Sequence, residues 1–314
     1  MKKGARPPVV CLMGPTATGK TEFALALAAQ FPLDIVSVDS ALVYRGMDVG
    51  TAKPDPATLR TVPHALVDIR DPEQSYSAGD FVRDARAEIA SSFDRDRVPL
   101  LVGGTMMYFR SLTAGIAELP EADATVRAEI DREAAAAGWE AMHGELRRVD
   151  EEAAARIDPN DSQRIQRALE VFRISGRPLS DWQAAAPAVQ NEFDYLKIGL
   201  VPASRPELHS RIETRLQKML AAGFVEEVAA LRSRPGLTAA HTSMRSVGYR
   251  QLWAHLDGAD SLEAAAQRAT AATRQLAKRQ LTWLRSEKAL ERVDPFEEGA
   301  AGTVRKLLHD TLSE

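Results

Sequence analysis

The stretch that decides the fold is Gly14-Pro15-Thr16-Ala17-Thr18-Gly19-Lys20-Thr21, which follows the apolar run Pro8-Val9-Val10-Cys11-Leu12-Met13 and precedes a helix-like run at residues 22–31. Strand, glycine-rich loop and helix in this order are typical of a phosphate-binding P-loop, because backbone N–H groups and the helix N-terminus then face an anion. We expect Lys20 to neutralise the phosphate and Thr21 to ligate Mg²⁺. A glycine-rich turn that matches by chance is the alternative, and the motif does not distinguish ATP from a leaving diphosphate.

Composition limits the class of protein. The 314 residues suffice for one large α/β domain and a smaller unit, since domains usually have about 100–200 residues. Cys11 is the single cysteine, and no metal-binding cluster is evident, which indicates a reducing compartment. No run approaches the roughly 20 apolar residues of a membrane span, and the basic residues 1–6 lead into a strand too short for a signal peptide. We expect a cytoplasmic protein that does not bind membranes.

The charge is unevenly distributed along the chain. The net charge of −4 argues by itself against a nucleic-acid-binding protein. Residues 118–161 hold thirteen Asp and Glu against five Lys and Arg, whereas residues 241–292 hold nine Lys and Arg against five Asp and Glu. A basic segment in an acidic protein can bind a polyanion, and a solvated helical surface explains the same pattern.

Strand-like and helix-like runs alternate in the first third of the chain. Further strands are predicted at residues 34–39, 65–69 and 98–102, and Ser77 is predicted to cap a helix. This alternation predicts an α/β fold with a doubly wound parallel sheet like that of P-loop NTPases, in which ligands lie at the carboxyl ends of the strands. Asp39 and Thr105 follow two such ends.

The character of the sequence changes near residue 117. It becomes charged, alanine-rich and helical, and the next strand-like run is at residues 195–200. We therefore predict a P-loop α/β core formed by residues 1–116 and 196–314, with a helical C-terminal part. Residues 117–195 are predicted to be a helical insertion domain.

Two short motifs at strand ends carry groups suited to chemistry. In Asp39-Ser40-Ala41-Leu42-Val43-Tyr44 the carboxylate could hold Mg²⁺ through water, accept a proton from a nucleophile, or cap a turn. In Gly103-Gly104-Thr105 the hydroxyl and N–H groups could bind a second anion or orient a nucleophile, and a plain N-cap is the alternative. The glycine, threonine and lysine residues at 46–54 weakly indicate a loop that binds a ligand.

Three later segments combine basic and amide side chains. They are Gln163-Arg164-Ile165-Gln166-Arg167, Arg245-Ser246-Val247-Gly248-Tyr249-Arg250 and Lys278-Arg279-Gln280-Leu281-Thr282-Trp283-Leu284-Arg285. Guanidinium and amide groups can bond bases and phosphates, and Trp283 could stack on a base or pack in the core. For each segment taken alone, a solvated surface is the default interpretation.

In this order, these motifs and Gly50-Thr51-Ala52-Lys53-Pro54 closely resemble those of bacterial tRNA dimethylallyltransferases, also called tRNA isopentenyltransferases. The resemblance spans residues 9 to about 290, and Leu42 stands where many relatives carry Gln. It implies that a dimethylallyl group moves from dimethylallyl diphosphate to the N6 amine of the adenosine just 3′ of the anticodon in tRNA, and that diphosphate is released.

The resemblance also implies roles for single residues. Asp39 would be the general base, Thr105 would position the amine or the diphosphate, and Lys20 with the P-loop and Mg²⁺ at Thr21 would stabilise the leaving group. Contacts to the tRNA anticodon stem-loop are implied for residues 39–42, Thr105, Arg127, and residues 163–167, 245–250 and 278–285.

Three other functions share some of these features. A P-loop small-molecule kinase shares the loop and the acidic residue, and an adenylate-type isopentenyltransferase shares the donor but needs no tRNA surface. A non-catalytic RNA-binding module leaves the P-loop without a use. No obligate protein partner is indicated, which is compatible with a monomer.

Overall fold

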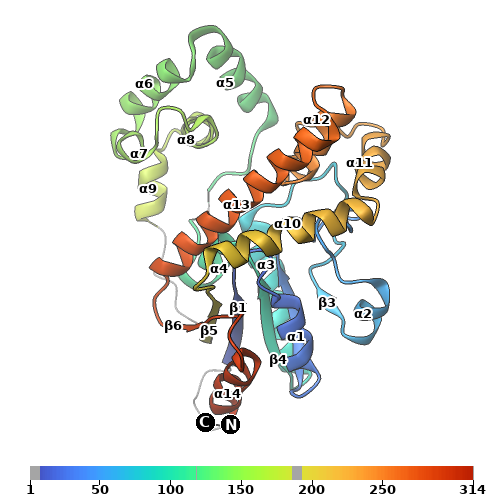
Figure 1. The fold of residues 1–314 in the computed structure, drawn as a ribbon. Helices are drawn as coiled ribbons and strands as arrows, with labels where there is room; N and C mark the ends of the chain where they lie inside the picture. The colour runs from blue at the N-terminus through green and yellow to red at the C-terminus, as the bar shows by residue number, and fades with distance from the viewer. Residues whose placement is uncertain (1–7, 118, 186–192, 314) are drawn as a thin grey trace. The chain divides into compact units, whose positions relative to one another are not determined.

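The chain forms two compact units in the computed structural model, which describes residues 8–117, 119–185 and 193–313 (Figure 1). The first, here called the sheet unit, comprises Met1–Thr113 and Asn191–Glu314, and the second, the helical unit, comprises Ala114–Gln190. None of the helices in the described ranges is long and apolar enough to span a membrane.

A six-stranded sheet lies at the centre of the sheet unit, in the order β3-β2-β4-β1-β5-β6. Its strands are β1 (Pro8–Met13), β2 (Leu33–Val38), β3 (His64–Ala65), β4 (Val98–Gly103), β5 (Asp194–Leu200) and β6 (Leu290–Val293). All neighbouring strands are parallel. The predicted α/β class with a parallel, doubly wound sheet is confirmed.

Helices cover both faces of this sheet. Successive residues of β1 point to opposite faces, so they pack against helices on both sides. Val10 and Leu12 belong to a core with α1 (Lys20–Ala28) and α14 (Ala300–Ser313). Cys11 belongs to the core on the other face, with α3 (Ala78–Asp94) and α4 (Met106–Ala114). The predicted cap of α3 is present, since Ser77 and Asp80 form a reciprocal capping box.

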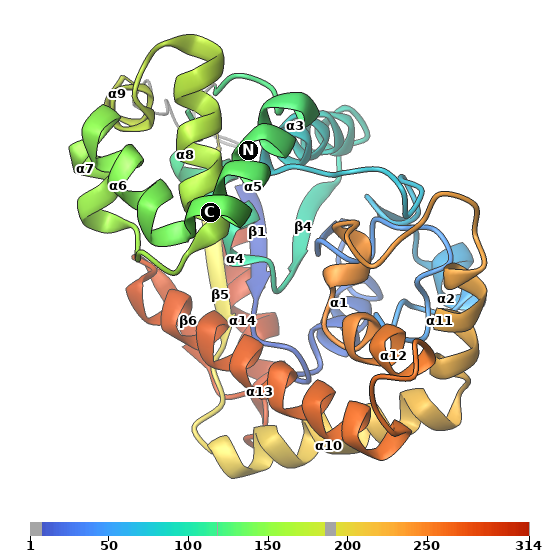
Figure 2. The same ribbon diagram turned by 90° about the horizontal axis from the view of Figure 1, so that it is seen from above.

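The helices after β5 form a layer that includes the predicted basic segment. They are α10 (Arg205–Ala221), α11 (Phe224–Arg232), the short 3₁₀ helix η1 (Ser243–Arg245), α12 (Tyr249–Leu256) and α13 (Leu262–Ser286). α13 packs against α10 and α12, and α10 and α13 lie side by side in both ribbon views (Figures 1 and 2).

The strand predicted at residues 65–69 was wrong beyond Ala65. Only His64 and Ala65 pair with β2, and the short helix α2 (Pro56–Thr61) precedes them. Leu66 and Asp68 have φ values of 62° and 56°, in the left-handed region that a strand does not use. The chain turns here because it bonds to the loop after β2, where the N–H of Asp68 donates to the carbonyl of Leu42 over 3.2 Å.

The helical unit has its own apolar core, to which Ile130, Leu146, Ile165 and Leu169 contribute. Its helices are α5 (Ala124–Ala137), α6 (Trp139–Val149), α7 (Glu151–Arg156), α8 (Ser162–Ser175) and α9 (Leu179–Ala184). Residues 118 and 186–192 of the predicted insertion lie outside the described residues. β5 begins at Asp194, so the predicted border between residues 195 and 196 falls inside a strand.

Candidate active site and nucleic-acid interface

The glycine-rich loop lies between β1 and α1 at the carboxyl edge of the sheet. Ala17 and Gly19 have φ values of 66° and 79°, and the hydroxyl of Thr18 donates to the carbonyl of Pro15 over 2.8 Å. Gly19, as the N-cap of α1, provides no side-chain cap. The first N–H groups of α1 therefore remain available to an anion, as the P-loop interpretation requires.

Lys20 is the first residue of α1, and its ammonium turns back into the loop. Its Nζ donates to the carbonyl of Pro15 over 2.7 Å. The pKa of Lys20 is lowered to about 8, mainly by desolvation in the surrounding protein and secondly by the positive charge of Arg215, while the charge of Asp39 opposes the shift. An anion bound in the loop would favour the charged form of Lys20, because it adds the missing negative charge.

Arg215 is a candidate site residue that the sequence analysis missed. It projects from α10, its Nη2 donates to the carbonyl of Thr51 over 3.1 Å, and its charge interacts with those of Lys20 and Asp39. Desolvation lowers the pKa of its guanidinium, and Asp39 opposes this. Nothing in the sequence marks Arg215, since it is one of several arginines on an amphipathic helix and reaches the site only through the fold.

Asp39 follows β2, and its two carboxylate oxygens have different surroundings. Oδ1 accepts hydrogen bonds from the N–H groups of Ala41 at 2.8 Å and Leu42 at 3.4 Å, so the residue does cap a turn. Oδ2 takes part in no hydrogen bond among the described residues. The turn thus fixes the carboxylate while one oxygen stays available to accept a proton.

Thr105 lies beside Asp39 because β2 and β4 are neighbours and Val38 pairs with Gly103. The N–H of Thr105 donates to the carbonyl of Val38 over 3.2 Å, and its hydroxyl oxygen accepts the N–H of Ser40 at 3.0 Å. A Cβ on Gly103 would lie 1.9 Å from the Val38 carbonyl oxygen, so only glycine permits this approach. The structure therefore brings Asp39, Ser40 and Thr105 together with the P-loop at one edge of the sheet.

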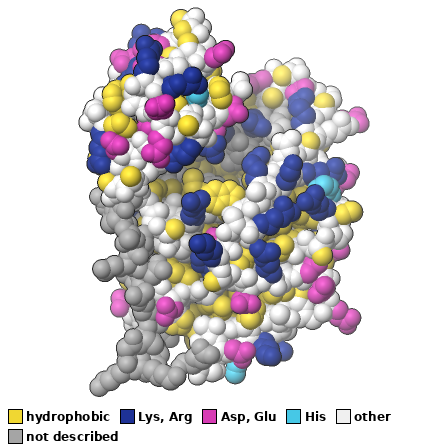
Figure 3. Space-filling view, turned by 90° about the vertical axis from the view of Figure 1, so that its left-hand side faces the viewer, with side chains coloured by type: hydrophobic (Ala, Val, Ile, Leu, Met, Phe, Trp, Pro, Cys, Tyr) yellow, Lys and Arg dark blue, Asp and Glu magenta, His cyan; other side chains and the backbone are white. Residues whose placement is uncertain are grey.

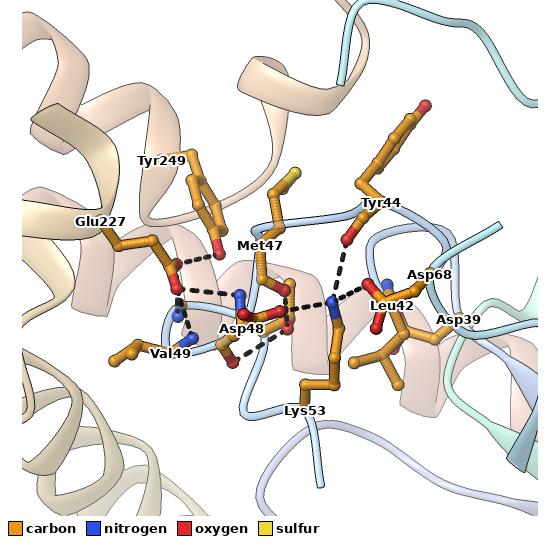
Figure 4. A network of polar contacts seen from close by, with 12 residues as sticks. Asp39, Leu42, Tyr44, Met47, Asp48, Val49, Lys53, Asp68, Glu227 and Tyr249 are labelled. Carbon is orange, nitrogen blue, oxygen red and sulfur yellow. Dashed lines mark hydrogen bonds and ion pairs between the residues drawn. The ribbon is translucent and has the colours of Figure 1, made fainter. Parts of the chain in front are cut away.

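The loop after Tyr44 is held by Glu227 of α11 (Figure 4). Its Oε2 accepts the N–H groups of Asp48 at 2.9 Å and Val49 at 2.7 Å, and its Oε1 accepts the N–H of Gly50 at 3.1 Å and the hydroxyl of Tyr249 at 2.6 Å. Burial and the charge of Glu227 raise the pKa of Tyr249, which stays a neutral donor. One carboxylate thus fixes three successive residues of the loop.

Lys53 is engaged inside the same loop. Its side chain is 4% exposed, and its Nζ lies 2.6 Å from Oδ1 of Asp48 and 2.6 Å from Oδ1 of Asp68 (Figure 4). It also donates to the carbonyl of Tyr44 over 2.9 Å. Lys53 therefore supports the loop instead of presenting a free charge to a ligand, as a ligand loop would.

The exposed side of α13 combines cationic, polar and aromatic side chains. They line a shallow groove: Gln275, Lys278, Arg279, Thr282 and Trp283. Trp283 is 36% exposed, and the guanidinium of Arg110 lies 5.4 Å from its ring centroid. Lys and Arg side chains recur among apolar ones on the face of the molecule in Figure 3. Such a surface is suited to phosphates and stacked bases.

A family model described as IPP transferase matches residues 42–287, more than half of the chain. The chain belongs to this family. It is 56% identical over 280 residues to a tRNA dimethylallyltransferase of Thiobacillus denitrificans, covering 89% of both chains, and 52% identical over 311 residues to one of Bordetella petrii, covering 98% of both. The family inferred from the ordered motifs is thereby confirmed.

Solved structures agree with this IPP transferase assignment. A tRNA isopentenylpyrophosphate transferase from Bacillus halodurans is 32% identical, has a TM-score of 0.71, and is matched over 98% of this chain and 97% of its own. A eukaryotic dimethylallyltransferase acting on tRNA is 23% identical with a TM-score of 0.81 and shares the fold over 98% of this chain and 80% of its own.

Not all of the residues predicted to contact tRNA lie on the surface of this IPP transferase. The side chains of Leu281 and Leu284 are buried in the core, and that of Gln280 is 8% exposed. These three were predicted from a continuous segment, but a helix presents only one side to solvent. Lys278, Arg279, Thr282, Trp283 and Arg285 are the segment's exposed members.

The predicted segment at residues 245–250 is similarly divided. Arg245 and Arg250 are exposed, on either side of the turn between η1 and α12. Tyr249 is fully buried and bonds to Glu227, so its ring is not free to stack on a base. Gly248 is needed there because its φ is +92° and a Cβ would lie 2.8 Å from the ring of Phe224.

In the helical unit, two of the arginines predicted to contact tRNA pair with the fully buried Glu170. Arg127 Nε lies 2.8 Å from Oε1 of Glu170, and Arg167 Nη1 lies 2.6 Å from Oε2. Desolvation alone would raise the pKa of Glu170, but the hydrogen bonds from both arginines lower it overall. Ile165 is buried in the core of this unit, whereas Gln163 and Arg164 are exposed.

Proposed function

We propose that the chain transfers a dimethylallyl group from dimethylallyl diphosphate to the N6 amine of the adenosine 3′-adjacent to the anticodon of tRNA, releasing diphosphate. The observation that carries this proposal is that a P-loop, the available oxygen of Asp39 and the hydroxyl of Thr105 share one edge of the sheet in an IPP transferase. The names of relatives at 50–56% identity give the same transferred group, dimethylallyl, and the same class of acceptor, tRNA.

The P-loop side of the site is suited to the leaving group. The C–O bond between the prenyl carbon and the diphosphate breaks, and its electron pair leaves with the diphosphate. Lys20 and the first N–H groups of α1 would stabilise the added negative charge. Arg215 would supply a second positive charge there, since it is close enough to Lys20 for its charge to lower the pKa of the lysine. Such donors act on departure of the diphosphate without phosphoryl transfer.

The Asp39 side of the site is suited to the acceptor. As the new N–C bond forms, the amine must lose a proton, and Oδ2 of Asp39 can accept it while Oδ1 remains bonded to the turn. Thr105 and Ser40, the residue after Asp39, form a pair of hydroxyls 3.4 Å apart, which can orient the amine. The adenosine must leave its stack to reach these groups.

Mg²⁺ is proposed as the cofactor. No group of three or more His, Cys, Asp or Glu side chains suited to a metal was found in residues 8–117, 119–185 and 193–313. Mg²⁺ is often held mainly by substrate phosphates and water, and the hydroxyl of Thr21, an exposed residue in the first turn of α1, would be the protein ligand here. When bound, it would neutralise the charge of the diphosphate.

The exposed basic residues are proposed to hold the tRNA. On the sheet unit these are Lys278, Arg279 and Arg285 of α13, with Trp283 as a stacking partner. On the helical unit, Gln163 and Arg164 are the exposed members of the predicted segment.

We further propose that the enzyme works in the cytoplasm, which accords with its unpaired, buried Cys11. We also propose that it needs no obligate protein partner.

The test follows the label of radiolabelled dimethylallyl diphosphate in the presence of Mg²⁺ and either unmodified tRNA, AMP or no acceptor. We expect label only in tRNA, and none in a tRNA transcript whose adenosine next to the anticodon is replaced by guanosine. Label in AMP would instead indicate an adenylate-type transferase. Absence of label with both acceptors, together with phosphate transfer from ATP to a small molecule, would indicate a kinase.

A further inference from the structure

Gln280 differs from the other polar residues of α13, because its side chain points into the protein. Its Oε1 accepts the N–H of Thr16 in the P-loop at 3.1 Å. Its Nε2 donates to the carbonyl of Gly104 over 2.8 Å, in a bond that is buried. Since Lys278 and Arg279 on the same helix are exposed, one turn of α13 faces both the solvent and the catalytic edge of the sheet.

The two partners of Gln280 belong to the two halves of the proposed active site. Thr16 lies in the loop proposed to hold the diphosphate, and Gly104 directly precedes Thr105, whose hydroxyl bonds to Ser40 next to Asp39. A second link between these halves is the bond from the N–H of Gly14 to the carbonyl of Gly103, at 3.3 Å. The amide of Gln280 is therefore a bridge between the donor side and the acceptor side.

The chemistry and packing of this bridge require a carboxamide. The side-chain amide of glutamine offers an acceptor and a donor on one planar group, whereas methionine has no donor and only a weak acceptor, and an ionised glutamate lacks the donor for Gly104. The fit is close, since a Cβ on Gly104 would lie 2.6 Å from Nε2 of Gln280. Loss of the amide would leave an N–H and a carbonyl without this partner in a mostly buried place.

We propose that Gln280 is a positioning residue that sets the separation between the P-loop and the Thr105 turn and couples both to the tRNA-facing helix α13. This inference rests on the proposed function. Gln280 touches neither substrate in this role. It acts through Thr16 and Gly104, so its loss should affect the alignment of the reacting atoms more than the binding of either substrate.

The test compares Gln280→Met and Gln280→Glu with Gln267→Met, a control at an exposed position of the same helix. For each variant we would measure the single-turnover rate of prenyl transfer at saturating substrates, the Kd for tRNA, the Kd for inorganic diphosphate, and the Tm. We expect both Gln280 variants to react on the order of 10²-fold more slowly, as a small misalignment can cause, with the Kd for tRNA unchanged. The control should match the wild type.

A second variant keeps the inference testable if Gln280→Met fails to fold. Gly104→Ala retains Gln280 but displaces its amide, so it should slow the reaction likewise. Adding Gly104→Ala to Gln280→Ala should cause less loss than Gly104→Ala causes in the wild type, because both changes break the same bridge and only the crowding of the Gly14 carbonyl, 3.2 Å from the new Cβ, is added. Wild-type rates in Gln280→Met, or a loss confined to tRNA affinity, would overturn the positioning role alone. A wild-type protein that transfers no prenyl group would overturn the proposed function.

Discussion

Asp39 has a turn role that the structure shows and a proposed catalytic role, and substitutions can separate the two. As a turn residue, its Oδ1 accepts the N–H groups of Ala41 and Leu42, and as the proposed base its Oδ2 accepts a proton. Asparagine keeps a carbonyl oxygen for the turn but cannot act as a base. Alanine removes both functions. Comparing Asp39→Asn with Asp39→Ala therefore distinguishes catalysis from support of the fold.

The size of each effect follows from these contacts. Loss of a general base costs about 10²- to 10⁴-fold in rate, equivalent to about 2.7–5.4 kcal/mol of transition-state stabilisation. Asp39→Asn and Asp39→Ala should share this loss. Asp39→Ala should also lower the free energy of unfolding by about 1 kcal/mol, since only the 2.8 Å bond of its two turn bonds has good length.

The assay is single-turnover prenyl transfer to an unmodified tRNA transcript at saturating donor, with tRNA affinity and denaturant unfolding measured on the same preparations. Both variants should bind tRNA like the wild type. A rate for Asp39→Asn within about tenfold of the wild type would refute the base assignment, because general-base catalysis contributes more than that. A low prenyl-transfer rate for Asp39→Ala together with a wild-type rate for Asp39→Asn would mean that Asp39 supports the turn alone.

Three further predictions concern binding and stability. Affinity for inorganic diphosphate should weaken as pH rises above about 8, because the free enzyme then loses the ammonium of Lys20, and Lys20→Met should abolish that pH dependence in calorimetric titrations. Arg279→Ala should weaken tRNA binding and reduce, by about one, the slope of the logarithm of the association constant against the logarithm of the salt concentration. The control Lys306→Ala on α14 should leave the affinity and the slope unchanged. An unchanged slope for Arg279→Ala would exclude a phosphate contact. Gly50→Ala should lower the free energy of unfolding by about 1–3 kcal/mol, because its Cβ would lie 2.0 Å from the buried ring of Phe224. Gly302→Ala is the control, since its Cβ would meet nothing within 4 Å and should not lower the free energy of unfolding. Equal stability of the two variants would contradict this prediction.

Local features of the site were predictable from the sequence. The P-loop is a continuous stretch whose strand, glycines and helix are all visible in one segment, and Asp39 and Thr105 lie within two residues of the end of a strand. The parallel sheet then brings these strand ends together by necessity. The cap of α3 was equally local, since Ser77 and Asp80 are three residues apart.

Features that depend on distant contacts were not predictable. Arg215 and Gln280 reach the site from helices more than 100 residues away in sequence from Thr51 and Thr16, and their neighbours look equally basic or polar. The predicted strand after Ala65 failed because an apolar run cannot show that its chain will bond to the loop after β2. A continuous motif also cannot show which of its side chains, such as Leu281, a helix turns inward.

The most direct test is a reaction without ATP, containing the wild-type protein, dimethylallyl diphosphate, Mg²⁺ and an unmodified tRNA transcript. Released diphosphate and the modified nucleoside, identified by mass spectrometry after nuclease digestion, are measured together. If the P-loop holds a leaving diphosphate and not a nucleoside triphosphate, one diphosphate is released for each N6-dimethylallyladenosine formed next to the anticodon. A strict requirement for ATP, or diphosphate release without a modified adenosine, would contradict the proposed function.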